Sequence, residues 1–127
     1  MRWLPLSAVL VVVLAGCGSP PSHHALAKSR DCLEQSGARI VRSKGDFVAS
    51  TASEGTFRAV LHDGTNFVTL SFGADDEEAR QIAGGYDRFH GKNVGVADIL
   101  YEDRNVIMLW KLHPSDDELK LVTDCLR

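Results

Sequence analysis

The stretch TFRAVLHDGTNFVTLSF, Thr56–Phe72, decides the fold of this chain. Two runs of strand-forming residues flank DGTN at positions 63–66, a composition typical of a tight turn. In the second run Val68, Leu70 and Phe72 occupy alternate positions, so they share one face of an extended strand. The stretch therefore predicts an antiparallel hairpin with one face directed at a core.

The residues that follow the hairpin predict a helix packed against it. Asp75 is placed to cap its N-terminus, with Glu78 in the capping-box position. Apolar residues then recur with the helical spacing i, i+3, i+4, i+7: Ala79, Ile82, Ala83, Tyr86 and Phe89. The segment HGKN, 90–93, is expected to end this helix.

A second hairpin followed by a helix is expected downstream. Val94–Tyr101 and Val106–Lys111 read as two strands around EDRN. Ser115 and Glu118 form a capping box, and the closing helix carries an apolar side. The two hairpin-helix segments resemble each other, because each contains an Asn, an apolar strand, an acidic helix start and an apolar helix. Such an echo favours two units of similar architecture.

The upstream part supplies one more helix and one more strand. Ala25–Ser36 suits a helix, and Gly37 stands where a C-terminal cap is expected. Ala38–Val48 reads as extended, interrupted by the turn SKGD, and ASTASEG at 49–55 reads as a polar loop. The order α-β-ββα-ββα predicts an α+β fold, an antiparallel sheet of four to five strands with three helices.

The first residues have the pattern of a secretory signal peptide. Met1-Arg2 carries one positive charge, and Leu4–Ala15 is an apolar run interrupted only by Pro5 and Ser7. Twelve residues are too few for a transmembrane helix, which needs about 20. This segment is therefore interpreted as a leader that directs the chain out of the cytoplasm.

The tetrad Leu14-Ala15-Gly16-Cys17 resembles the lipobox of bacterial lipoproteins. The resemblance implies that residues 1–16 are cleaved, that the Cys17 thiol receives a diacylglycerol, and that the new amine is acylated, with palmitate as the expected chain. Residues 17–24 then form the lipidated cysteine and a flexible Gly/Ser/Pro tether, and 25–127 a single domain. The expected location is the extracytoplasmic face of the cell membrane, held by lipid. The alternative is an ordinary secretory leader with a coincidental cysteine.

Cys32 and Cys125 remain once Cys17 is assigned to the lipid. A single pair of cysteines in an oxidising compartment predicts one disulfide bond. In the chain-entropy view a loop this long contributes roughly 4–5 kcal/mol of stability. The rival interpretation is two free thiols, one of them reactive, although neither lies in a Cys-x-x-Cys motif.

Motifs that would assign a chemistry are weak throughout. Loss of Arg2 with the leader moves the net charge from −3 to −4, which does not favour nucleic acid as a partner. His62, His90 and His113 each end a predicted element, and their spacing supports no metal site. The acidic clusters begin helices, where they complement the helix dipole. Neither Gly-x-Ser-x-Gly nor Ser-x-x-Lys occurs, so no catalytic residue is assigned.

The strand VIMLW, Val106–Trp110, is apolar on both faces. Either it is a central strand whose second face is covered, for instance by the first helix, or apolar surface stays open. In the second case Phe67, Tyr101 and Trp110 are the candidate interaction surface.

These observations predict a membrane-anchored envelope lipoprotein without cofactor, and most readily a non-catalytic binding or protein-interaction module with an envelope protein as partner. Two alternatives stay open. One is a small-ligand or metal-binding lipoprotein, using the three histidines. The other is a small envelope enzyme, because catalytic groups can be assembled by folding alone.

Overall fold

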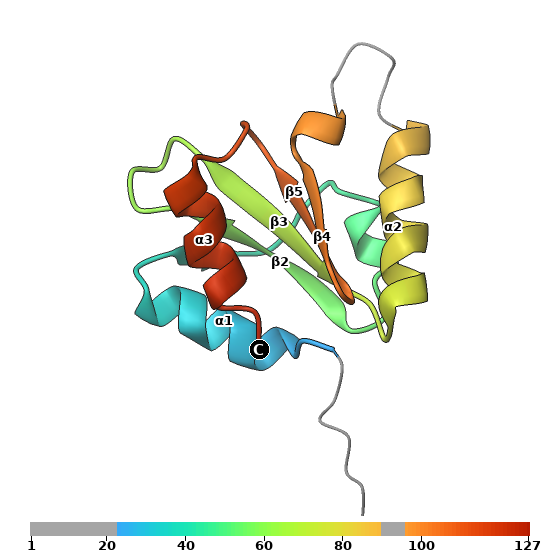
Figure 1. The fold of residues 1–127 in the computed structure, drawn as a ribbon, viewed down its shortest axis with the longest axis horizontal. Helices are drawn as coiled ribbons and strands as arrows, with labels where there is room; N and C mark the ends of the chain where they lie inside the picture. Colours follow the sequence, from blue (N-terminus) through green and yellow to red (C-terminus); the bar gives the residue numbers. More distant parts are fainter. Residues whose placement is uncertain (1–22, 90–95) are drawn as a thin grey trace, which may run out of the picture.

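A computed structural model describes residues 23–89 and 96–127 of the chain. Over these residues an antiparallel five-stranded sheet lies between two layers of helices (Figure 1). The strands are β1 (Arg39–Val41), β2 (Gly55–Val60), β3 (Phe67–Phe72), β4 (Leu100–Asp103) and β5 (Val106–Trp110). The helices are α1 (Leu26–Gln35), α2 (Asp76–Phe89) and α3 (Asp116–Asp124), with 3-10 turns η1 (Ala49–Thr51) and η2 (Val96–Asp98). The predicted α+β fold and its element order are confirmed.

The strands follow the order β1-β2-β3-β5-β4 across the sheet, so each predicted hairpin pairs with the other through β3 and β5. Leu70 at the centre of β3 lies opposite Phe57 on one side and Met108 on the other. All three side chains are buried on the same face of the sheet. This register puts the alternate apolar residues of the first hairpin in the main core, as their spacing predicts.

Helices α1 and α3 cover one face of the sheet, which we call the α1/α3 face (Figure 1). Its core is the larger one and consists of Leu33, Ala38, Phe57, Ala59, Leu61, Val68, Leu70, Phe72, Val106, Met108, Trp110, Val122, Cys125 and Leu126. Helix α2 and the turn η1 cover the opposite face, the α2 face. Its smaller core consists of Val48, Ala79, Ile82, Tyr86, Val96 and Ile107.

Strand β5 is central and is buried on both faces. Met108 is 1% exposed toward α1 and α3, and Ile107 is fully buried toward α2. The expectation that the first helix covers the second face is wrong, because α1 shares its face with α3 and the cover comes from α2. The apolar character of VIMLW thus follows from a sheet enclosed on two sides.

Three local expectations need correction. The extended segment Ala38–Val48 contains only a three-residue strand, and the polar loop after it contains η1. The predicted strand Val94–Tyr101 is a 3-10 turn followed by β4, and its first two residues lie outside the described part. Two residues assigned to the turn EDRN belong to β4, and Arg104 makes the turn with a φ of 54°. Tertiary contacts decide such short elements more than local propensity does.

Asn66 and Asn105 occupy equivalent places in the two hairpin-helix units. Each precedes a strand, and each side chain binds the backbone just beyond the end of the other strand. The Asn105 Nδ2 donates to the carbonyl of Gly73 at 2.8 Å, and the Asn66 Nδ2 donates to the carbonyl of Leu112 at 3.3 Å. The echo in the sequence therefore corresponds to similar contacts that each asparagine makes across the antiparallel strands β3 and β5.

The two units place their helices on opposite faces of the sheet, and the residues after each asparagine differ in the same way. Two residues after Asn66 comes Val68, in the core of the α1/α3 face, and two after Asn105 comes Ile107, in the core of the α2 face. Helix α1 has no counterpart on the α2 face. Within the part of the chain that the structure describes, η1 alone covers the β1 and β2 side of that face, and it covers only one end.

Candidate functional site

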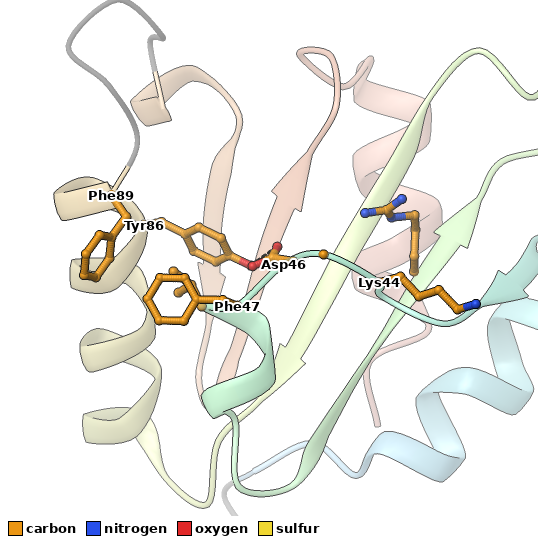
Figure 2. Close-up of a pocket in the computed structure, with 8 residues that line it drawn as sticks. Lys44, Asp46, Phe47, Tyr86 and Phe89 are labelled. Atoms are coloured by element: carbon orange, nitrogen blue, oxygen red, sulfur yellow. Dashed lines mark hydrogen bonds between the residues drawn. The ribbon is translucent and has the colours of Figure 1, made fainter.

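A pocket of about 330 Å³ lies where α2 ends, at the border of the open part of the α2 face (Figure 2). It is formed by the loop between β1 and η1, the last turn of α2, and strand β2. Its lining residues are Lys44, Gly45, Asp46, Phe47, Val48, Arg58, Tyr86 and Phe89. We call it the Phe47 pocket.

Two aromatic rings form one wall of the Phe47 pocket (Figure 2). Phe47 and Phe89 are each 59% exposed, and their ring centroids lie 5.0 Å apart at an interplanar angle of 72°. Phe89 ends the apolar stripe of α2, at a point where the helix has passed beyond its core. Exposed apolar groups of this size that are paired with each other mark an interaction site more often than isolated ones do.

Tyr86 and Asp46 form the polar floor of the pocket. The buried Tyr86 hydroxyl donates to Asp46 Oδ2 at 2.6 Å, while Asp46 Oδ1 accepts from the backbone N–H of Ala49 at 2.9 Å. Burial, reinforced by the Asp46 carboxylate, raises the pKa of Tyr86 far above its ordinary value. Both Asp46 oxygens hold the loop in place, and the phenol stays protonated. The floor is therefore rigid and suited to orienting a bound group.

Arg58 connects the pocket to the open part of the sheet. Its guanidinium carbon lies 4.3 Å from the centroid of the Phe67 ring, and the Lys111 Nζ lies 5.7 Å from the same centroid. Arg39 is opposite Val60, which is opposite Phe67, so Arg39 belongs to the same face. We call Arg39, Arg58, Phe67 and Lys111 the cationic platform. The Phe67 ring thus makes cation–π contacts with Arg58 and Lys111, two of the three positively charged residues of the platform.

The predicted interaction surface of Phe67, Tyr101 and Trp110 does not exist as one surface. Trp110 is 1% exposed, because it lies opposite Val68 in the core that α1 and α3 cover. Tyr101 is half-buried and packs against that same core. Phe67 projects from the α2 face, where it is half-buried. Of the three candidates, only Phe67 belongs to the open surface.

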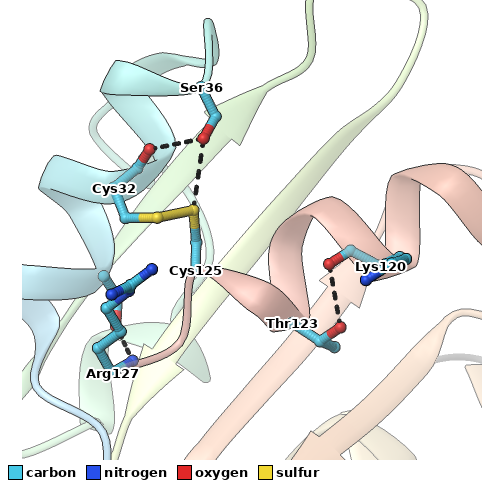
Figure 3. The surroundings of a disulfide bond; sticks show 7 residues. Cys32, Ser36, Lys120, Thr123, Cys125 and Arg127 are labelled. Atoms are coloured by element: carbon cyan, nitrogen blue, oxygen red, sulfur yellow. Dashed lines mark hydrogen bonds between the residues drawn. A yellow bond between two sulfur atoms is a disulfide. The ribbon is translucent and has the colours of Figure 1, made fainter.

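Cys32 and Cys125 form the predicted disulfide, which joins α1 to the end of α3 (Figure 3). The Ser36 hydroxyl donates to the Cys32 carbonyl at 2.9 Å and contacts the Cys125 sulfur at 3.6 Å. Nearby, the Ala25 N–H donates to the Arg127 carbonyl at 2.6 Å. Bridge and backbone together hold the first and last helices of the domain side by side.

The other predicted site residues lie apart from the pocket. Cys17 and His90 lie outside the described residues. His62 and His113 are exposed, and among residues 23–89 and 96–127 no three His, Cys, Asp or Glu side chains could hold a metal ion together. His24, placed in the tether by its sequence, is instead fixed to the domain. Its N–H donates to Asn105 Oδ1 at 2.6 Å, and its carbonyl accepts from Asn105 Nδ2 at 3.0 Å.

The sequence does not single out Phe47, Arg58 or Lys44 as functional residues. Phe47 lies in a segment read as extended, and Arg58 is one polar residue in an alternating strand. Phe89 belongs to an apolar helical stripe, a pattern that predicts burial. The available signal was the stripe itself, because a helix that ends on a large aromatic beside a polar loop leaves that ring near the surface.

No protein-family model, curated protein or solved structure matches this chain. In the part of the chain that the structure describes, every helix is too short or too polar to cross a bilayer.

Proposed function

We propose that this protein is a lipid-anchored lipoprotein of the cell envelope whose domain is a non-catalytic binding module, and that its partner inserts an apolar group into the Phe47 pocket. The observation that carries the proposal is the pair of exposed rings, Phe47 and Phe89, beside a floor held rigid by Tyr86 and Asp46. Binding sites commonly combine an apolar wall with a few fixed polar groups. The rings are already in contact, so little conformational entropy is lost when a partner covers them.

The place where the tether joins the domain supports the proposal that the pocket is accessible to a partner. His24 is held by Asn105, beside the end of β3 at Gly73, whereas the platform lies at the start of β3. Six strand residues span about 20 Å. A domain anchored through Cys17 would then carry the pocket at the end remote from its attachment point, accessible to other envelope components.

Site-specific photocrosslinking in intact cells tests the binding function. A benzophenone-bearing phenylalanine at position 47 keeps an aromatic ring in the pocket, and the same residue at position 112 is the matched control, because Leu112 is 52% exposed. We expect a discrete adduct from position 47 that is lost with Phe89→Ser and absent from position 112. Equal adducts from both positions, or none, would refute the proposal.

The anchor is tested separately with Cys17→Ser. We expect this variant to leave the membrane fraction or to accumulate as uncleaved precursor, because acylation of the thiol is the proposed attachment. Unchanged membrane association together with normal leader cleavage would contradict the lipoprotein assignment without affecting the pocket.

A further inference from the structure

We infer that the partner is an acidic polypeptide segment that places an apolar side chain in the Phe47 pocket and its carboxylates on the cationic platform. This inference rests on the proposed binding function and adds the chemistry of the partner. It is carried by the continuity of the two sites, because Arg58 belongs to both the pocket and the platform.

Among residues 23–89 and 96–127, no helix covers the surface that such a segment needs. Helix α2 covers β5 and its neighbours, and η1 covers the far end of β2, so Val41, Val60 and Phe67 are only half-buried on this face. On the opposite face the β1 and β2 side is closed by α1. In the described residues, α1 covers the β1 and β2 side of the α1/α3 face, but no helix covers the platform on the α2 face. Helix α2 therefore stands above the platform, and the two form a step.

The charge of this surface runs against the charge of the protein. The chain has a net charge of −3, yet the platform carries three cations, and Lys44 adds a fourth at the pocket. Ion pairs in the described residues involve His24, Arg30, Arg80 and Lys120, and none involves the platform. Asp46 is the only carboxylate among the described residues that line the pocket. Its two oxygens already accept hydrogen bonds from the Tyr86 hydroxyl and the Ala49 N–H. This uncompensated charge calls for an anionic partner.

The side chains of the cationic platform are preorganised before a partner binds. Phe67 supports Arg58 and Lys111 at once, so the two long side chains are held over one ring. The Arg58 Nε is buried and has no hydrogen-bond partner within the described residues. Arg58 is half-buried at this surface, and a guanidinium pairs with carboxylates in a planar, directional way.

The shape of the site favours a polypeptide over a membrane surface. Arg58 and Phe67 are half-buried beside α2, whereas the Phe47 and Phe89 rings protrude. A flat bilayer that meets the rings would not reach the half-buried guanidinium of Arg58, which lies beside a helix about 10 Å thick. An extended segment can follow the step, since six residues cover about 20 Å. Alternate side chains of such a segment would face the sheet and the solvent.

The test uses the lipidated full-length protein reconstituted in phosphatidylcholine vesicles. A random dodecapeptide phage library is panned on these vesicles, and the enriched peptides are synthesised with a fluorophore for anisotropy titrations. We expect peptides rich in Asp and Glu around one aromatic or large aliphatic residue. Their affinity should fall severalfold when the salt concentration rises from 0.05 to 0.5 M, because such contacts are screened.

Charge reversals locate the binding surface. Lys111→Glu and Arg39→Glu alter exposed side chains and should each weaken binding about tenfold. Lys28→Glu makes the same charge change on α1, on the opposite face, and should alter the affinity less than about twofold. Equal effects of Lys111→Glu and Lys28→Glu would overturn the assignment to the platform.

The remaining outcomes separate this inference from the proposed function. Enriched peptides that need Phe47 but lack acidic residues would overturn the inference and leave the binding module intact. A library that yields no Phe47-dependent peptide would count against both. Phosphatidylglycerol vesicles that compete as well as the unlabelled peptide would identify a membrane surface as the ligand and overturn the polypeptide assignment.

Discussion

Asn66 and Asn105 are single residues on which the arrangement of the sheet depends. Asn105 is fully buried, and its amide makes three hydrogen bonds to the backbone of His24 and Gly73. Asn66 is 3% exposed and makes the corresponding contacts with Leu112, and also donates to Glu118 Oε2 at 2.8 Å. Both side chains use their donors and their acceptor fully, as buried amides must.

Asn105→Ala is expected to lower the free energy of unfolding by about 2–4 kcal/mol, because it leaves several buried backbone groups without partners. Asn66→Ala should have a loss of similar size. Urea unfolding followed by circular dichroism measures both. Gln81→Ala, on the exposed side of α2, is the control and should change the stability by less than about 0.5 kcal/mol. A loss for Asn105→Ala no larger than for the control would contradict this account.

Tyr86 predicts a dependence of stability on alkaline pH. Its pKa is raised by burial first and by Asp46 second, so the folded protein keeps the phenolic proton at a pH where the unfolded chain releases it. The contribution of Tyr86 is fully present below about pH 10 and declines as the pH rises above that value. Tyr86→Phe should cost about 1 kcal/mol at pH 7 through the lost hydrogen bond. The difference between wild type and variant should shrink by about 1 kcal/mol at pH 11. Parallel urea-derived stability curves from pH 8 to 11 would contradict the prediction.

At the scale of elements, the consecutive glycines of α2 offer a matched pair. A Cβ at Gly84 would meet no atom within 4 Å, whereas a Cβ at Gly85 would lie 3.0 Å from Val48 Cγ1. Gly84→Ala should therefore stabilise the protein by about 0.5–1 kcal/mol through helix propensity. Gly85→Ala should lose this gain, since the new methyl displaces the segment that carries Phe47. Thermal unfolding of the two variants measures the difference, and equal stabilisation by both would show that Val48 yields freely.

The elements also show what a sequence can predict. The first hairpin, α2 and α3 follow from local periodicity and capping, and the Ser115–Glu118 capping box is present in full. At α2 only half of the predicted box forms. The Asp75 carboxylate accepts from the Glu78 N–H at 2.8 Å, but the Glu78 carboxylate accepts from Ser53 and Ala74 instead. Ser53 is distant in sequence, so no local pattern could reveal this competitor.

The candidate site was less predictable for the same physical reason. Alternation correctly separates Phe67 from the main core, but it cannot say which helix covers which face. That depends on the pairing of β3 with β5, a long-range contact. Sequence alone therefore leaves Trp110 as a candidate for an open surface although two helices bury it, and it does not indicate that the sheet places Arg58 over Phe67.

At the scale of the whole molecule, the disulfide closes a loop between residues separated by 93 positions. Replacing both cysteines by serine should lower the stability by about 4 kcal/mol, mainly by releasing the unfolded chain. Urea unfolding with and without reductant checks this value. Alkylation without reductant should add no mass at Cys32 or Cys125. Two added alkyl groups on the native protein would contradict the bridge.

If the proposed leader exports the chain, the position of the bridge also constrains the order of events. If the chain crosses the membrane from its N-terminus, Cys32 emerges long before Cys125, and all five strands lie between them. The Cys32 thiol then stays free until Cys125 follows, and during this time it is exposed to oxidants and to wrong disulfides with neighbouring proteins. The Cys32–Cys125 disulfide can therefore form only after all five strand segments of the chain have crossed the membrane. A stalled or truncated chain is distinguishable by its unpaired cysteine.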